Sequence, residues 1–288
     1  PRHQPRNPPG RGRLGLGQGP PRGALNAVTG TGGSTGKARA GAAGVDKLAL
    51  TGETTTGVSM LQQAAPNITR VSLELGGKSP NIVFADADLE KAAVGAVGSV
   101  FANAGQDCCA RSRAFVARSI AEEFDQRVAA GTRELKVGDP LDATTEMGPL
   151  IAMKQRERVQ GYIAVGGREG ARLLTGGSAP SGPLAKGSYL EPAVFDRASN
   201  GMRIAQEEIF GPVLTIIPFD DEGEVIRMVN DSPYGLSGSR WPPDIGRAPR
   251  VPRPVQTAGL SSNSTKSLHQ EPTLGAPQPQ RTGAKSGV

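Results

Sequence analysis

The chain has 288 residues, enough for one large domain or two ordinary ones. Its net charge of +6 is unevenly spread. Residues 1–45 have seven basic and no acidic side chains, and residues 240–288 have seven basic and two acidic ones. The middle, residues 46–239, has 19 basic and 25 acidic side chains. The basic ends are rich in proline and glycine and lack aromatic platforms for bases, so we expect no nucleic-acid binding. Without a ~20-residue apolar run or a secretory leader, we expect no membrane association and a cytoplasmic protein.

Short apolar segments alternate with longer amphipathic ones from about residue 25, which predicts an α/β fold with a largely parallel sheet. The segment 25–30 is apolar and then turns. The expected strands are 45–52, 70–77, 80–85, 172–174, 189–195 and 212–219. The expected helices are 86–103, 119–135, 153–166 and 222–230. Eight prolines between residues 242 and 279 predict little packed structure beyond residue 240.

Two of these helices carry signals for their first turn. Asp86 or Asp88 can cap the helix over 86–103. Ser119, with Glu122 three residues later, has the spacing of a capping box before the helix over 119–135.

The segment GTGGSTGKA, residues 30–38, matches a phosphate-binding loop in composition only. Thr31 stands where the nucleotide-triphosphate motif needs glycine, and Ala38 follows Lys37 where that motif needs serine or threonine. The dinucleotide fingerprint also fails, because the third glycine is Gly36 instead of residue 35. We expect a glycine-rich turn that opens a helix.

The only two cysteines, Cys108 and Cys109, are adjacent in AGQDCCARSR. Neighbouring cysteines very rarely meet disulfide geometry, and with only His3 and His269 elsewhere they are too few for a zinc site, so we expect no metal. They are either two buried apolar side chains or include one reactive thiol. A glycine-containing loop and the nearby Arg111 and Arg113 favour a thiolate.

Two further stretches carry candidate site residues. In LELGGKSPN, residues 73–81, Glu74 precedes Gly76 and Gly77, whose backbone can approach a ligand closely. Glu74 is either a strand-edge partner of an arginine or a general base. In EEIFGPV, residues 207–213, Glu207 is typical of a helix end on the surface. The segment IFGPV that follows is less typical of such a helix end.

Together, LELGGKSPN, GQDCCA and EEIFGPV resemble the NAD(P)-dependent aldehyde dehydrogenase family in order and separation. The resemblance is closest over residues 73–239 and looser from about 25 to 270. It implies a parallel-sheet catalytic domain over 77–262 and a partial Rossmann-like cofactor domain over 25–76, between irregular ends at 1–24 and 263–288.

The resemblance also implies roles for individual residues. Cys108 would be the nucleophile, Cys109 a neighbour without a role, and Glu74 the general base that releases a carboxylic acid from a thioester. Glu208 would bond the nicotinamide ribose, with Phe210 beside it. The cofactor-binding residues implied are Gly52, Glu53, Gly57, Gly76, Glu208 and Phe210.

The chain also departs from the family pattern. Glu53 stands where many members have serine, which places an acid near the cofactor diphosphate. The ends lack the family's ribose-contacting strand, oxyanion asparagine and oligomerisation segments, so we expect a truncated chain. The resemblance implies an aldehyde substrate, NAD or NADP, and a homo-oligomeric family; the alternative is a non-catalytic remnant. Neither the aldehyde nor the choice between the two cofactors follows from the sequence.

Overall fold

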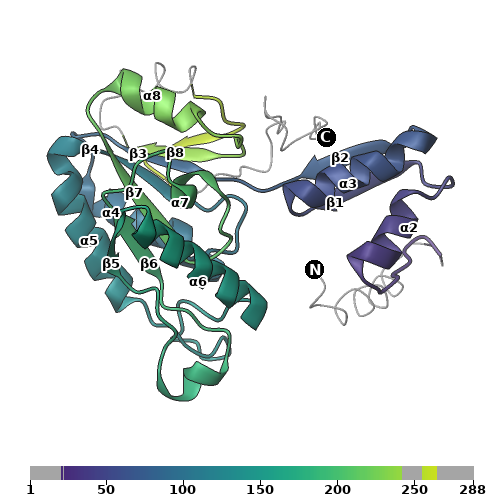
Figure 1. Cartoon of the computed structure of the whole chain (residues 1–288), viewed down its shortest axis with the longest axis horizontal. Helices are drawn as coiled ribbons and strands as arrows, with labels where there is room; N and C mark the ends of the chain where they lie inside the picture. The colour runs from purple at the N-terminus through teal and green to yellow at the C-terminus, as the bar shows by residue number, and fades with distance from the viewer. Residues whose placement is uncertain (1–20, 22, 242–254, 265–288) are drawn as a thin grey trace. The chain divides into compact units, whose positions relative to one another are not determined.

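The computed structural model describes residues 21, 23–241 and 255–264 (Figure 1). The chain divides into two compact units, Pro1–Glu74 and Leu75–Val288. The boundary expected from the sequence lay two residues later, and the division into a cofactor and a catalytic domain stays a prediction. The irregular ends expected at 1–24 and 263–288 lie almost entirely outside the described residues. Within the described residues, no helix is long and apolar enough to cross a membrane.

Unit 1 is a small parallel α/β unit. Its elements are a π-helical turn, Gly32–Gly36, then α2 (Lys37–Ala40), β1 (Lys47–Thr51), α3 (Thr54–Ala64), a 3-10 turn (Ala65–Asn67) and β2 (Arg70–Glu74). The strands pair in parallel with Thr51 opposite Glu74, and a small core contains Ala40, Leu48 and Ala64. The glycine-rich turn does open a helix, because the Thr31 side chain accepts from the Ser34 amide at 3.3 Å.

Unit 2 holds the large sheet. Its strands are β3 (Pro80–Val83), β4 (Arg113–Ala117), β5 (Arg172–Thr175), β6 (Ala193–Asp196), β7 (Val213–Phe219), β8 (Gly238–Trp241) and β9 (Leu260–Ser262). Its helices are α4 (Leu89–Phe101), α5 (Ala121–Glu134), α6 (Met153–Arg168), α7 (Arg203–Gln206) and α8 (Glu222–Asn230). Three 3-10 turns, Ala102–Gly105, Arg118–Ile120 and Gly182–Lys186, complete the described elements.

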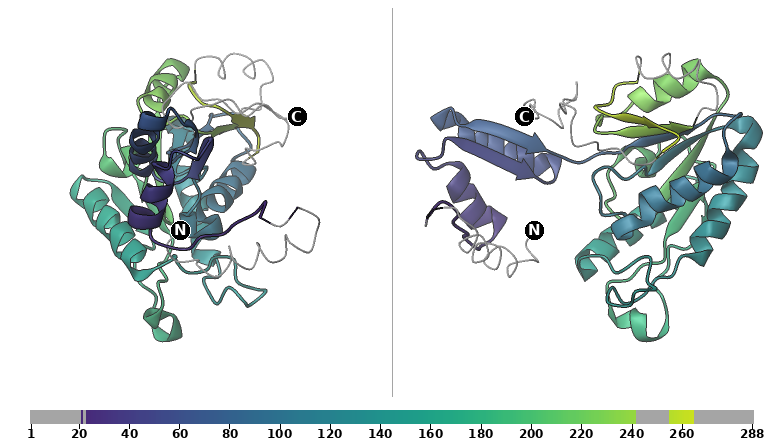
Figure 2. Two further views of the ribbon diagram at one scale, coloured as in Figure 1. Left: turned by 90° about the vertical axis from the view of Figure 1, so that its right-hand side faces the viewer. Right: turned by 180° about the vertical axis from the view of Figure 1, so that it is seen from behind.

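The seven strands run in the order β5-β6-β7-β4-β3-β8-β9 and pair in parallel except for β5 with β6. Strands β3, β4 and β6 are buried throughout, as expected for parallel strands covered on both faces. Helices α4 and α5 lie side by side on the sheet, where Val100 and Phe124 are fully buried (Figure 2). The predicted α/β fold with a largely parallel sheet is confirmed.

The segment 25–30 is exposed and lies outside the helices and strands. Three local expectations were wrong. The strand expected over 189–195 covers only Ala193–Asp196, since Pro192 cannot donate to a ladder. The Ser119 side chain makes no capping hydrogen bond to α5 in the described structure, because a 3-10 turn over Arg118–Ile120 precedes that helix. Packed structure continues beyond residue 240, with β9 parallel to β8 and Val255 buried.

Candidate functional site

The two cysteines lie on the loop that connects α4 to β4 in unit 2. After α4 the backbone turns through three residues with positive φ: Asn103 at 52°, Ala104 at 54° and Gly105 at 70°. At Gly105 a Cβ would lie 2.1 Å from the carbonyl oxygen of Gly211, so both the conformation and the space require glycine. Gln106 then accepts from the amide of Ile151 at 2.9 Å, which ties the loop to the segment before α6.

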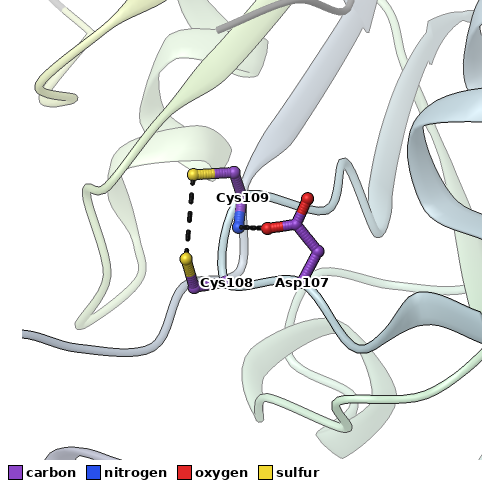
Figure 3. A group of neighbouring side chains, drawn as sticks. All are labelled: Asp107, Cys108 and Cys109. Atoms are coloured by element: carbon purple, nitrogen blue, oxygen red, sulfur yellow. Dashed lines mark hydrogen bonds between the residues drawn. The ribbon is translucent and has the colours of Figure 1, made fainter. Parts of the chain in front are cut away.

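The thiols of Cys108 and Cys109 form a contacting pair. Their Sγ atoms lie 3.9 Å apart on the same side of the loop, and both side chains are half-buried (Figure 3). The carboxylate of Asp107 accepts from the Cys109 amide at 2.8 Å, which fixes the turn between them. Cys109 is therefore the hydrogen-bond partner of Cys108 and more than a neighbour in sequence.

A buried arginine supports the thiol pair from the protein interior. Arg111 is 1% exposed, and its Nη1 donates to the carbonyl of Cys109 and to the hydroxyl of Ser237, each at 2.6 Å. Ser237 in turn lies 3.0 Å from the Ser79 hydroxyl. This chain of contacts connects the cysteine loop to the strands β3 and β8.

The surroundings favour ionisation at Cys109 over Cys108. The pKa of Cys109 is lowered to about 6, first by the hydrogen bond from the Cys108 thiol and then by the Ser237 hydroxyl and the charge of Arg111, against the opposing effect of burial. The pKa of Cys108 is raised, first by that same bond and then by burial and by the charges near it. The hydrogen bond between them makes the two thiols titrate as a pair, with the proton favoured on Cys108.

Two glycines, Gly76 and Gly77, lie between Glu208 and the cysteine loop. Its Oε1 accepts from the Gly77 amide at 3.1 Å. A Cβ on Gly76 would lie 2.0 Å from Glu208 Oε2, and a Cβ on Gly77 would lie 2.4 Å from the carbonyl oxygen of Cys108. The pair Gly76-Gly77 therefore lets one stretch of backbone contact both the glutamate and the cysteine loop.

Phe210 completes this region. Its φ is 56°, an uncommon conformation for an aromatic residue, and its side chain is 40% exposed. Gln155 of α6 donates to the Phe210 carbonyl at 2.8 Å and holds that turn. A small depression lies between the cysteine loop, Gly77 and this turn. It is lined by Gly77, Gly105, Asp107, Ala110, Ser112, Glu208, Ile209, Phe210, Gly211 and Val213.

Arg113, the second arginine of the cysteine motif, serves another function. It is 1% exposed, and its Nε donates to the Lys78 carbonyl at 2.9 Å. Lys78 is itself buried, and its Nζ has no hydrogen-bond partner among the residues that the structure describes. Burial, followed by the charge of Arg113, lowers the pKa of Lys78 to about 7. Only Arg111, of the two arginines that the sequence offered, acts on the thiols.

The remaining predicted residues lie in unit 1. Glu74 ends β2, and its carbonyl accepts from the Gly52 amide at 3.0 Å, so the candidate base and the candidate cofactor turn lie at one edge of the strand pair. Glu53 is the N-cap residue of α3, and its carbonyl accepts from the Gly57 amide at 3.0 Å. The backbone amides at the N-terminus of α3 favour an anion, whereas the acidic side chain of Glu53 beside them disfavours one.

Sequence reasoning missed the roles of Ser237, Ser79 and Gln155. Ser237 and Ser79 lie within stretches that match the family, but no spacing rule connects a residue near 79 with one near 237. Gln155 was counted only as part of a helix. Their contacts depend on the order of β3 and β8 in the sheet and on the packing of α6, which local patterns do not carry.

The sequence of the chain is similar to a known protein family and to individual proteins of that family. Residues 16–278 match the model of the aldehyde dehydrogenase family. Among similar proteins, betaine aldehyde dehydrogenase of Bacillus subtilis is 44% identical over 234 residues, 81% of this chain and 48% of that protein. Betaine aldehyde dehydrogenase 1 of Rhizobium meliloti is 40% identical over 268 residues, 93% of this chain and 55% of that protein.

The fold has close counterparts among solved structures. The crystal structure of betaine aldehyde dehydrogenase from Staphylococcus aureus in complex with NAD+ is similar with a TM-score of 0.92 and 37% identity, over 96% of this chain and 55% of that one. The chain thus spans about half the length of the relatives that it matches. The match to the family model covers most of the sequence, and the chain belongs to the aldehyde dehydrogenase family.

Proposed function

We propose that the chain carries the nucleophile and part of the cofactor site for NAD(P)-dependent oxidation of an aldehyde to a carboxylic acid. The observation that carries the proposal is the contact of Gly76-Gly77 with both Glu208 and the cysteine loop within one unit. It combines a thiol pair able to form a thiolate with a carboxylate able to hold a ribose hydroxyl, beside a small depression.

The residues fit the nicotinamide side of such a cofactor. Because Gly76 has no Cβ, the Glu208 carboxylate lies close against the backbone there, where it can accept from a ribose hydroxyl, and Phe210 offers an exposed aromatic surface. The diphosphate side fits less well, since the amides at the start of α3 suit an anion and the Glu53 carboxylate does not. When bound, NAD(P)+ supplies an acceptor for the hydride that leaves the substrate carbon.

The chain's own groups account for the remaining chemistry. A proton moves from the Cys108 thiol to the Cys109 thiolate, and the Cys108 sulfur adds to the aldehyde carbon to form the oxyanion of a thiohemiacetal. The oxyanion re-forms the carbonyl as hydride leaves that carbon, and a thioester remains on Cys108. In the second half-reaction Glu74 takes a proton from water, and the water oxygen adds to the thioester carbonyl. The carbon–sulfur bond then breaks, the carboxylic acid leaves, and Glu74 returns the proton to the Cys108 sulfur.

The experiment is mass spectrometry of the intact chain after incubation with NAD+ and an aldehyde. Because the relatives are betaine aldehyde dehydrogenases, betaine aldehyde is the first substrate to test. We expect a covalent acyl adduct on Cys108 that accumulates in Glu74→Gln, is absent from Cys108→Ala and still forms in Cys109→Ala. An adduct that persists in Cys108→Ala would assign the nucleophile elsewhere.

The second candidate is a non-catalytic member of the family, favoured by Glu53 at the start of α3. That candidate predicts that NADH fluorescence does not change on titration with the chain. The variant Glu53→Ser separates the two candidates, because recovery of NADH binding would identify charge repulsion as the cause. Saturable NADH binding by the unaltered chain would remove charge repulsion at Glu53 as the ground for the non-catalytic candidate.

A further inference from the structure

Asp107, Cys108 and Cys109 present three possible metal ligands on one loop. The two sulfurs and a carboxylate oxygen all lie within 4.8 Å of one another. Among the residues that the structure describes, this is the one group of three or more such side chains close enough to share an ion. The expectation of no metal rested on the missing four-ligand spacing of structural zinc motifs, whereas an open site needs only three protein ligands.

The separation of the sulfurs matches the spacing that a tetrahedral thiophilic ion requires. Two thiolates bound to zinc at ~2.3 Å with a tetrahedral angle lie ~3.8 Å apart. The Sγ atoms of Cys108 and Cys109 are 3.9 Å apart, and both point to the same side of the loop (Figure 3). An ion can therefore bridge them without a change in the backbone.

The Asp107 carboxylate supplies the third ligand. One oxygen, Oδ1, accepts from the Cys109 amide and fixes the residue at the start of the turn. The side chain is exposed, and a carboxylate oxygen lies within 4.8 Å of both sulfurs. Two thiolates and one carboxylate leave the fourth tetrahedral position to water.

Charge balance also permits an ion at this position. The Arg111 guanidinium lies beside the loop, and its Nη1 is directed to the Cys109 carbonyl and the Ser237 hydroxyl. Three anionic ligands exceed the single charge of Arg111. On binding, each thiol still protonated loses its proton to solvent as a metal–sulfur bond forms, with no change in oxidation state.

We propose that Asp107, Cys108 and Cys109 bind one thiophilic divalent cation of the zinc class. The ion occupies both sulfurs and blocks addition of Cys108 to any carbonyl. Binding of the ion stands apart from the proposed function; only its inhibitory effect rests on Cys108 being the nucleophile.

The test uses Cd²⁺ as a spectroscopic probe on the whole chain reduced with a phosphine. We expect one equivalent of Cd²⁺ to produce an ultraviolet thiolate-to-metal charge-transfer band, and Zn²⁺ to displace it. In the unaltered chain, Zn²⁺ should also protect both cysteines from iodoacetamide, and a chelator should restore their alkylation. Neither measurement requires activity, so a failure of the proposed function does not affect the result.

Variants separate the three ligands. We expect Cys108→Ser and Cys109→Ser each to weaken Cd²⁺ binding by more than ~100-fold, and Asp107→Asn by at least ~10-fold, since even indirect partners of a ligand are worth 10–100-fold. Asp107→Asn keeps an oxygen for the Cys109 amide. The matched control is Asp142→Asn, because Asp142 is also exposed and accepts an amide two residues on, from Thr144 at 2.9 Å.

The outcomes are decisive in either direction. The proposal stands if Cd²⁺ binds in a 1:1 ratio, both serine variants lose the band and Asp142→Asn retains full affinity. It is overturned if the unaltered chain shows no band or protection, or if one thiol alone gives the full affinity. Equal affinity of Asp107→Asn and the unaltered chain would remove the carboxylate from the site.

Discussion

The Gly77 amide donates a 3.1 Å hydrogen bond to Glu208 Oε1, across 131 residues of sequence. The neighbouring Gly76 leaves the space that the other carboxylate oxygen occupies. Since that oxygen is the end of a flexible side chain, a methyl group at residue 76 would displace the carboxylate and leave the backbone in place. The position of Glu208 thus depends on a missing side chain.

Gly76→Ala should therefore weaken cofactor binding with little loss of stability. Loss of one hydrogen bond to a charged group, worth about 1.5–3 kcal/mol, corresponds to an NADH affinity roughly 10–100-fold lower. Fluorescence titration with NADH measures the change. Gly98→Ala is the control, because a Cβ there has no neighbour within 4 Å. Equal NADH affinities of Gly76→Ala and the unaltered chain would show that the carboxylate does not need this position.

The thiol pair should show its shared proton in the pH dependence of alkylation. Iodoacetamide reacts with thiolates, so labelling of the unaltered chain should rise with a midpoint near the Cys109 pKa of about 6. Removing Cys108 takes away the bond that most lowers this pKa, and removing Cys109 leaves only the less acidic thiol. Both Cys108→Ala and Cys109→Ala should therefore label with midpoints above about 6. A midpoint that stays near 6 in both variants would mean that the thiols ionise independently.

Asp125 should make unit 2 less stable as the pH rises. Burial and then the charge of Asp196 raise the pKa of Asp125 to about 7. Arg172, which bonds to Asp196 at 2.9 Å, lowers this pKa, and the charge of Glu122 raises it. Between about pH 4 and pH 7 the folded chain thus holds a proton that the unfolded chain has released. The free energy of unfolding falls across this window and levels off above it.

Asp125→Asn should remove this part of the pH dependence. The variant should gain on the order of 1–2 kcal/mol over the unaltered chain between pH 4 and pH 8, a value discounted for the partial exposure of the carboxyl. Urea unfolding followed by the fluorescence of Trp241 reports on unit 2, because this single tryptophan is buried on β8. A constant difference between the two proteins across that range would contradict the assignment.

The sequence predicted the alternation of strands and helices because buried parallel strands and amphipathic helices are local patterns. It identified β7 to within one residue and α8 over its full length. The sequence did not predict β8 and β9. Gly238–Trp241 has the same turn-like composition as the stretch before it, and it is recognisable as a strand only from its pairing with distant strands in the sheet. The contacts of Ser237 with Arg111 and of Gly77 with Glu208 were likewise invisible, because each connects residues more than 100 positions apart.

The two capping signals behave differently, and this difference is measurable. Asp88 accepts from the Lys91 amide at 3.1 Å and begins α4, so Asp88→Ala should cost about 1 kcal/mol. Ser119 lies in the 3-10 turn before α5 and makes no capping bond, so Ser119→Ala should change stability by less than ~0.5 kcal/mol. Urea midpoints read from Trp241 compare both variants in one experiment. Equal costs for the two would mean that Ser119 forms the capping box that its spacing to Glu122 suggests, with α5 beginning one turn earlier.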